Sequence, residues 1–183
     1  MATDEVELRF GRVDSPIGAV LVACRGDTLC ALDFEDHEDR MLAELRRRFR
    51  RFRRLGVHDP GGVCTRLHAY FKGDIQAVDD IEVDGGGTPF QRKVWKGLRR
   101  IKAGKVSSYG ALAERLGIPT AVRAVGHANA LNPISIVVPC HRVIGSDGSL
   151  TGYGGGLERK AWLLKHEGVA MPSLSQRPRS SGK

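Results

Sequence analysis

Short runs of apolar and β-branched residues, separated by turn-forming residues, fill the first third of the chain. Runs of this kind predict strands, and the short turns between them predict an antiparallel meander. The expected strands cover residues 9–14, 19–24 and 29–34. The apolar spacing then becomes helical over residues 37–52, and a second helix is expected over residues 62–71.

The second half has helical spacing over most of its length. Thr88 followed by Pro89 predicts a helix start, because a hydroxyl residue caps the first turn and proline fits its first position. Ser108 and Thr120 are expected to cap two further helices, the second of which covers residues 121–130. The short connection between these two helices predicts a helix-turn-helix.

Two more segments complete the pattern. The apolar run at residues 134–138 predicts a buried strand. A last helix is expected over residues 157–167, with Leu157, Ala161 and Leu164 on its apolar face.

Composition divides the chain into two expected domains. Residues 1–84 predict a small α/β domain and residues 88–170 a mainly helical one, joined by a glycine linker at residues 85–87. The Ser-, Pro- and Arg-rich residues 171–183 are expected to form a disordered tail.

Charge is distributed unevenly between these halves. The whole chain carries +8, yet residues 1–87 hold 13 Lys and Arg against 17 Asp and Glu, whereas residues 88–170 hold 13 against 4. A positive half is expected to attract a polyanion such as nucleic acid, although a surface that serves only solubility would have the same composition.

The chain has no sequence feature of a membrane or secreted protein. No apolar stretch is long enough to span a bilayer, and the acidic N-terminus lacks the apolar core of a signal peptide. The four cysteines are scattered, which is typical of a reducing compartment. We therefore expect a cytoplasmic protein without a membrane partner.

The segment from Pro139 to His141 has the strongest chemical signal. Pro139 restricts the backbone directly before Cys140. His141 follows the cysteine, and a histidine side chain titrates near neutral pH. A thiolate is the reactive form of cysteine, so Cys140 is a candidate nucleophile and His141 a candidate base.

The second half resembles the O6-alkylguanine-DNA alkyltransferases. The resemblance runs, in that family's order, through Thr88-Pro89-Phe90-Gln91, Ser108-Tyr109, Arg123-Ala124-Val125-Gly126, Asn132-Pro133, Pro139-Cys140-His141-Arg142-Val143, Gly152-Tyr153-Gly154-Gly155-Gly156 and Leu163-Leu164-Lys165-His166-Glu167-Gly168. The first half resembles the family more loosely, through Asp14-Ser15-Pro16-Ile17-Gly18 and His68-Ala69-Tyr70-Phe71. This resemblance implies a ribonuclease-H-like N-terminal domain and a winged helix-turn-helix-like C-terminal domain.

The family resemblance also implies an activity. It is the repair of duplex DNA by direct damage reversal, in which the alkyl group of O6-alkylguanine moves irreversibly to Cys140 after the base has left the stack. O4-alkylthymine is implied as a weaker substrate. Each molecule would act once and would need no cofactor, because the nucleophile is consumed.

Roles for further residues follow from the same resemblance. His141 would accept the thiol proton through a water, and Glu167 would orient the imidazole, although a charged residue near a helix end would look the same in the sequence. Asn132 matches a hinge asparagine, and an Asn-Pro turn is the plain alternative. Tyr109 would offer its hydroxyl to the flipped base, and a half-buried aromatic side chain is its alternative.

The base pocket implied by the resemblance combines two segments. Pro139 and Val143 flank the nucleophile, and the carbonyls of Cys140 and Val143 would receive the guanine amine. Tyr153 and Gly154 belong to a glycine-rich loop whose N–H groups would contact O6. A phosphate cradle is disfavoured, because no P-loop or dinucleotide fingerprint is present.

The helix expected at residues 121–130 is the candidate DNA-binding element. Its alanines make it thin, which suits a minor groove and reads little sequence, although a small-residue helix can also pack in a core. The resemblance places an intercalating arginine at Arg123, and a phosphate contact is the alternative role. Ala124, Thr120, Ser108 and Tyr109 complete the implied DNA surface.

Two features of the first half remain open. Some family members bind zinc there, but Cys24 and Cys30 lack partners for a tetrahedral site, so no metal is expected. The arginine-rich residues 46–54 are interpreted as a solvated face, with a second phosphate contact or cooperative self-association on DNA as the alternative.

Three other functions compete with the alkyltransferase. One is a protein that binds the lesion without transferring the alkyl group. Relatives of this kind that resemble the alkyltransferases carry tryptophan where this chain has Cys140. A Cys-His hydrolase would turn over many times. A transcription regulator is supported only by the helix-turn-helix, which is a common motif.

Overall fold

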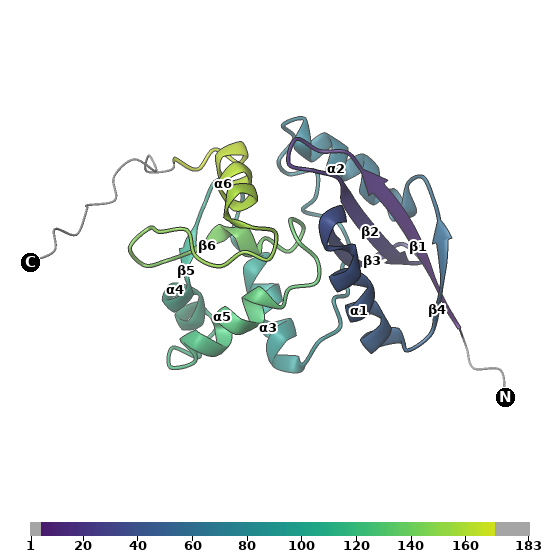
Figure 1. Cartoon of the computed structure of the whole chain (residues 1–183). Helices are drawn as coiled ribbons and strands as arrows, with labels where there is room; N and C mark the ends of the chain where they lie inside the picture. The colour runs from purple at the N-terminus through teal and green to yellow at the C-terminus, as the bar shows by residue number, and fades with distance from the viewer. Residues whose placement is uncertain (1–4, 171–183) are drawn as a thin grey trace, which may run out of the picture.

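The computed structural model describes residues 5–170, so the tail predicted at residues 171–183 lies outside the described part. The first half contains a four-stranded sheet in the order β3-β2-β1-β4 (Figure 1). Its strands are β1 (Val6–Val13), β2 (Val20–Arg25), β3 (Thr28–Phe34) and β4 (Phe52–Gly56). The pairs β1–β2 and β2–β3 are antiparallel, which confirms the predicted meander.

Strand β4 was not predicted. It pairs parallel to β1 at the edge of the sheet, and four of its five residues are exposed. The predicted helix at residues 37–52 is α1 (Glu38–Phe49), and it ends earlier because Arg50 has a positive φ of 55°. An exposed edge strand rich in arginine has no apolar alternation, so local sequence rules could not detect it.

Helices cover both faces of this sheet. On one face Met41 and Leu45 of α1 pack against alternate strand residues such as Leu21 and Ala23. On the other face lies α2 (Val63–Phe71), whose side chains share a cluster with Val20 and Val22. Successive strand residues point to opposite faces, so the two helices bury both sides of β2.

The second half is mainly helical, as predicted. Its helices are α3 (Pro89–Leu98), α4 (Tyr109–Arg115), α5 (Val122–Ala130) and α6 (Leu157–His166), with the short parallel strands β5 (Ser107–Ser108) and β6 (Val143–Ile144). Thr88 and Gln91 form a capping box at the start of α3, and the Ser108 hydroxyl caps α4 by accepting from the Ala111 N–H at 3.1 Å.

Two details of the helix prediction were wrong. Thr120 does not cap α5: Ala121 precedes the helix without a side-chain cap, because the Ala121 N–H closes a turn onto the Ile118 carbonyl at 2.9 Å. Leu157 is 48 % exposed, whereas Lys160 and Leu163 of α6 are fully buried. Leu164 of the predicted face is fully buried and Ala161 is half-buried, so only Leu157 departs from the predicted stripe.

The predicted strand at residues 134–138 is also absent. Only Ile134 forms a bridge, to Leu32 of β3, and Ile136 has a positive φ of 69° that breaks an extended conformation. The segment is nevertheless buried as expected. Its bridge attaches the cysteine segment of the second half to the sheet of the first.

One hydrophobic cluster runs through both halves, from Leu32 and Tyr70 to Val94, Val138 and Cys140. None of the helices within residues 5–170 is long and apolar enough to cross a membrane. The division into domains at residues 85–87 stays a prediction.

Candidate active site

Cys140 begins a single 3-10 turn, Cys140–Arg142, directly after Pro139. All three residues of this turn are buried, and Cys140 is 5 % exposed. The Cys140 N–H bonds to the Val138 carbonyl at 2.8 Å, which draws the thiol back over the preceding segment. A nucleophile on such a short, buried turn has little freedom to move away from its neighbours.

Asn132 holds the cysteine segment at the end of α5. Its Nδ2 donates to the Val138 carbonyl at 2.8 Å and lies 3.1 Å from the Cys140 Sγ. Its Oδ1 accepts from the Ile134 N–H at 3.0 Å. The side chain therefore joins the helix, the buried segment and the thiol, as expected of a hinge.

Glu167 is the centre of a buried polar network (3 % exposed). The His141 Nε2 donates to its Oε1 at 2.9 Å, and Tyr70 of α2 donates to the same oxygen at 2.8 Å. Arg142 donates Nε to Oε2 at 2.8 Å and Nη2 to Oε1 at 2.9 Å, while its Nη1 donates to the Ile101 carbonyl. The carboxylate thus has more donors than a surface glutamate would ever gather.

These contacts determine how the network is protonated. Burial alone would raise the pKa of Glu167, but the hydrogen bonds from His141 and Arg142 and the charge of Arg142 outweigh it and hold that pKa well below its ordinary value. Burial lowers the pKa of His141, against the opposing effect of Glu167, so its imidazole is neutral at neutral pH. Because an ionised carboxylate only accepts, Nε2 carries the proton and Nδ1 holds the lone pair.

The Nδ1 of His141 is buried and has no hydrogen-bond partner among the described residues. A buried polar atom without a partner is costly, so such atoms often mark a catalytic role or a site for an ordered water. In this site the atom is the Nδ1 of a neutral imidazole, which can accept a hydrogen bond, and His141 directly follows Cys140 in the sequence.

The environment of Cys140 disfavours a permanently ionised thiol. Burial raises its pKa, and the hydrogen bond from Asn132 and the charge of Lys160 oppose that rise. Lys160 is itself fully buried, and its Nζ donates to the carbonyls of Val143 and Thr151 at 2.6 Å each. Burial lowers the pKa of Lys160 to about 8. Ionisation of Cys140 therefore depends on a base that takes its proton.

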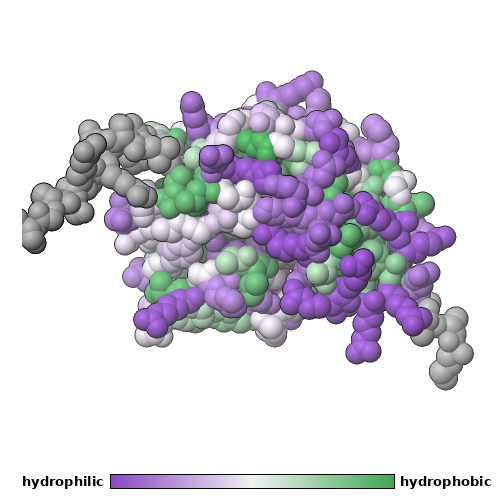
Figure 2. Space-filling model, viewed as in Figure 1, coloured by the Kyte–Doolittle hydropathy of each residue, from purple (hydrophilic) through white to green (hydrophobic). Residues whose placement is uncertain are grey.

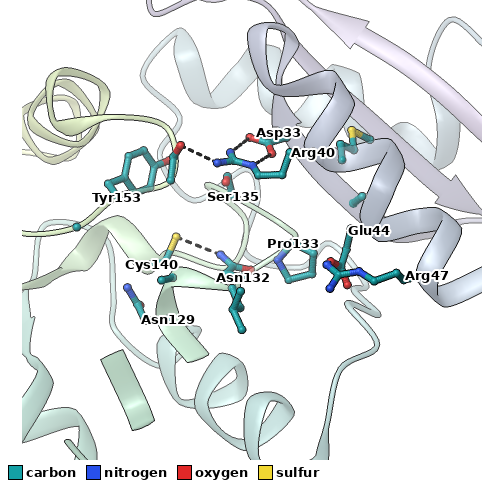
Figure 3. Close-up of a pocket in the computed structure, with 16 residues that line it drawn as sticks. Asp33, Arg40, Glu44, Arg47, Asn129, Asn132, Pro133, Ser135, Cys140 and Tyr153 are labelled. Carbon is teal, nitrogen blue, oxygen red and sulfur yellow. Dashed lines mark hydrogen bonds and ion pairs between the residues drawn. The ribbon is translucent and has the colours of Figure 1, made fainter. Parts of the chain in front are cut away.

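A cavity opens beside the thiol between the two halves of the chain (Figure 3). Its volume is about 120 Å³. Residues of the second half on its wall are Asn129, Asn132, Ser135, Cys140, Tyr153 and Gly154, and those of the first half are Asp33, Arg40, Met41, Glu44 and Arg47. Cys140 is thus buried in the protein yet reachable through this cavity.

Two of the four predicted base-pocket residues line this cavity, and Pro139 and Val143 do not. Tyr153 and Gly154 line it, and the Tyr153 ring meets His141 edge-on with the ring centres 6.4 Å apart. Pro139 and Val143 are buried next to Cys140. The Val143 carbonyl already accepts from Lys160, so a guanine amine would have to use its second lone pair.

Helix α5 presents a narrow exposed face. Arg123, Ala124 and His127 are exposed on it, whereas Val125 and Ala128 are buried. Tyr109 packs near Gly126 of α5, and its hydroxyl donates to the Thr151 carbonyl at 3.4 Å. The predicted DNA-contacting residues of α4 and α5 therefore meet close to the glycine-rich loop.

The arginine-rich residues 46–54 lie at the end of α1 and in β4, where Figure 2 shows hydrophilic side chains over α1. Several of their guanidinium groups are already paired with carboxylates of the same half. The pairs are Arg47 with Glu44, Arg48 with Asp84, Arg53 with Glu7 and Arg54 with Glu38. This pairing favours the solvated-face interpretation.

Cys24 and Cys30 lie in β2 and β3, and both are buried. No group of three or more His, Cys, Asp or Glu side chains that could hold a metal is found within residues 5–170. Burial raises the pKa of Cys24 to about 12, which makes its thiol inert.

Comparison with known families decides the relationship. Residues 89–169 match the family model of the 6-O-methylguanine DNA methyltransferase DNA binding domain, and residues 8–84 match that of its ribonuclease-like domain. The chain belongs to the 6-O-methylguanine DNA methyltransferase family. The predicted fold class, a ribonuclease-like α/β half followed by a helical DNA-binding half, is thereby confirmed.

Named relatives agree with this assignment. The chain is 49 % identical over 163 residues to a methylated-DNA–protein-cysteine methyltransferase of Salmonella typhimurium, covering 87 % of this chain and 95 % of the relative. A protein of the same name from Mycobacterium tuberculosis is 44 % identical over 169 residues, which cover 91 % of this chain and 96 % of the relative.

Solved structures give the same result. Mycobacterium tuberculosis OGT in complex with DNA aligns with a TM-score of 0.71 at 38 % identity, covering 87 % of this chain and 92 % of that one. The O6-methylguanine-DNA methyltransferase of Pyrococcus kodakaraensis aligns with a TM-score of 0.71 at 29 % identity, covering 88 % and 99 %.

Sequence reasoning missed three residues of this methyltransferase site: Arg142, Tyr70 and Lys160. Arg142 follows the Cys-His pair directly, so its position in the motif was a signal that could have been used. Tyr70 lies in the family-like segment His68-Ala69-Tyr70-Phe71, but nothing local links it to Glu167, and Lys160 had no signal, because each reaches the site only through tertiary contacts.

Proposed function

We propose that this methyltransferase repairs O6-alkylguanine in duplex DNA by moving the alkyl group to the Cys140 sulfur. The observation that carries the proposal is a cavity-lining thiol followed in the chain by a neutral imidazole, which bonds to a buried carboxylate from a second motif. O4-alkylthymine presents the same O-alkyl chemistry and is proposed as a weaker substrate.

The reaction is a displacement at the alkyl carbon. The thiol proton passes through one water to the free Nδ1 of His141, and Glu167 stabilises the imidazolium that forms. The sulfur then bonds to the alkyl carbon as the bond from that carbon to O6 breaks, and guanine leaves with the electron pair. The Tyr109 hydroxyl donates to the departing base, which limits its negative charge.

The protonation states of His141 and Glu167 before the reaction support this order of events. A neutral His141 can accept a proton, and the ionised Glu167 makes the imidazole a stronger base than burial alone would leave it. Asn132 and the Lys160 charge stabilise the thiolate once it forms. A thioether cannot be hydrolysed by this set of groups, so each molecule acts once and no cofactor is consumed.

The proposed DNA contact uses the exposed face of α5. Its small side chains allow close approach to a minor groove, where little sequence information is read. Arg123 fills the space left by the extruded base, Ala124 and Thr120 approach the backbone, and Tyr109 adjoins the flipped nucleotide. Ser108 contributes mainly as the cap that orients Tyr109. Cooperative self-association on DNA stays a prediction.

A stoichiometry experiment tests the function. Wild-type protein incubated with excess duplex carrying O6-methylguanine is expected to gain about 14 Da, one CH₂ unit, on the peptide that contains Cys140. Intact-mass spectrometry should show product formation stopping at one equivalent per protein. Continued turnover would instead indicate a hydrolase, and tight binding with an unmodified thiol would indicate a lesion binder.

Replacing Arg123 with alanine is expected to slow alkyl transfer by about 10- to 100-fold, because nothing then occupies the gap left by a base whose extrusion costs a few kcal/mol. Single-turnover rates on duplex substrate would measure the loss. His127→Ala is the matched control, since His127 is exposed on the same helix and is expected to change the rate less than about threefold. Equal losses in both variants would argue for general phosphate attraction.

A further inference from the structure

The wall of the Cys140 cavity that faces the first half of the chain is held by an ion pair from that half. Arg40 of α1 donates Nε and Nη2 to the Asp33 carboxylate of β3 at 3.0 and 2.8 Å. Its Nη1 donates to the Gly154 carbonyl at 2.9 Å, across 114 positions of sequence. The Asp33 side chain is only 11 % exposed and also accepts from the Phe34 N–H, so the acceptor is held rigidly.

A second arginine holds the other end of the same loop. Arg159 donates to the Ile17 carbonyl at 2.9 Å, to Asp36 at 3.0 Å and to the Gly155 carbonyl at 3.3 Å. Its guanidinium also lies 4.1 Å from the centre of the Phe34 ring. Gly154 and Gly155 are therefore held against the first half by two arginines.

The glycines of the loop make this close contact sterically feasible. A Cβ on Gly155 would lie 2.7 Å from the Phe34 ring, and one on Gly154 would lie 3.3 Å from the Arg40 guanidinium. Gly152 and Gly156, which flank the fastened residues, have positive φ values of 41° and 94°. The loop thus turns at two glycines in conformations that other residues rarely adopt, and its centre lies in contact with Arg40 and Phe34 of the first half.

Arg40 lines the cavity, and three of its five N–H groups are committed to protein acceptors, which leaves one N–H on each Nη. Each of its three hydrogen-bonding nitrogens is directed at Asp33 or Gly154 (Figure 3). The bond to the Gly154 carbonyl therefore gives Arg40 a direct effect on the position of one residue of the cavity wall. Arg47 of the same helix also lines the cavity, yet it pairs only with Glu44 and does not contact the loop.

We propose that the Asp33–Arg40 pair is a specificity-determining element, which pins Gly154 and so limits the size of the alkyl group that can reach Cys140. The inference rests on the proposed alkyl transfer. It assigns to the ribonuclease-like half a role in substrate choice, although that half carries none of the reacting groups. Arg40 is a positioning residue, since it acts on the cavity through Gly154.

The test compares two substrates in two arginine variants of the full chain. Single-turnover rates would be measured with matched duplexes carrying O6-methylguanine or O6-benzylguanine. Arg40→Ala is expected to raise the benzyl-to-methyl rate ratio by about tenfold, since small changes in pocket width shift selectivity on this scale. Arg47→Ala should leave the ratio within about twofold, because it removes a cavity-lining arginine without releasing the loop.

Two milder variants keep the test informative if Arg40→Ala does not fold. Arg40→Lys keeps the charge but replaces the planar three-nitrogen fork with one nitrogen, so the two-point contact with Asp33 is lost and the ratio should rise partway. Asp33→Asn should act in the same direction. An unchanged ratio in these variants, or an equal rise in Arg47→Ala, overturns the inference. If the wild type alkylates Cys140 with neither substrate, the proposed function itself fails, which separates the two failures.

Discussion

Replacing Cys140 with alanine is expected to abolish alkyl transfer, with a loss of more than about 10⁴-fold, because the sulfur is the atom that forms the new bond. Affinity for lesion-containing duplex should stay within about threefold, since the side chain is 5 % exposed and adds little to the DNA surface. Transfer of a labelled methyl group to protein and a binding titration would measure the two properties separately.

The control for this prediction is a second buried cysteine. Cys30 lies in β3, and its thiol contacts the Thr28 carbonyl rather than any group of the site. Cys30→Ala should therefore accept one equivalent of methyl, at a small cost in stability. Label on protein in the Cys140→Ala variant would show that another nucleophile accepts the alkyl group and would refute the mechanism.

Replacing Arg142 with alanine is expected to lower the free energy of unfolding by about 3–5 kcal/mol, because it leaves the Glu167 carboxylate buried without its permanent positive partner. The side chains of this pair are 4 % and 0 % exposed, so water cannot take over the lost hydrogen bonds. The Ile101 carbonyl would lose its donor as well. Urea unfolding at pH 7 would measure the change.

An exposed ion pair supplies the comparison for Arg142. Arg47 pairs with Glu44 on the surface of α1, and its side chain is 74 % exposed. Arg47→Ala should change stability by less than about 1 kcal/mol, since surface pairs are screened by water. Similar losses in the two variants would mean that the Glu167 network is less critical than its burial indicates.

The same Arg142 variant should also react more slowly. Arg142 holds both oxygens of Glu167, and Glu167 in turn fixes which His141 nitrogen carries the proton. This connection explains why the arginine of the Pro-Cys-His-Arg-Val motif belongs to the chemistry although it does not face the cavity. A local motif therefore encodes the nucleophile, the base and the arginine that holds Glu167, the residue that positions the base.

Local sequence rules succeeded where the contacts are local. The Thr88–Gln91 capping box and the Ser108 cap depend on atoms three residues apart, so they could be predicted directly. Thr120 is a threonine like Thr88, yet it does not cap α5, because a turn that joins the Ala121 N–H to the Ile118 carbonyl precedes the helix. Strand β4 was missed because its partner β1 lies more than forty positions away.

The sequence by itself determined the family, the meander, most helices and the identity of the nucleophile, because ordered motifs and apolar spacing are properties of neighbouring residues. Only the tertiary structure showed that Tyr70 and Arg142 meet at Glu167, that Lys160 supports the cysteine turn, and that Arg40 fastens the cavity wall. These contacts join residues up to 114 positions apart. Their distances depend on how two packed halves share one core, and no local pattern of side chains encodes that arrangement.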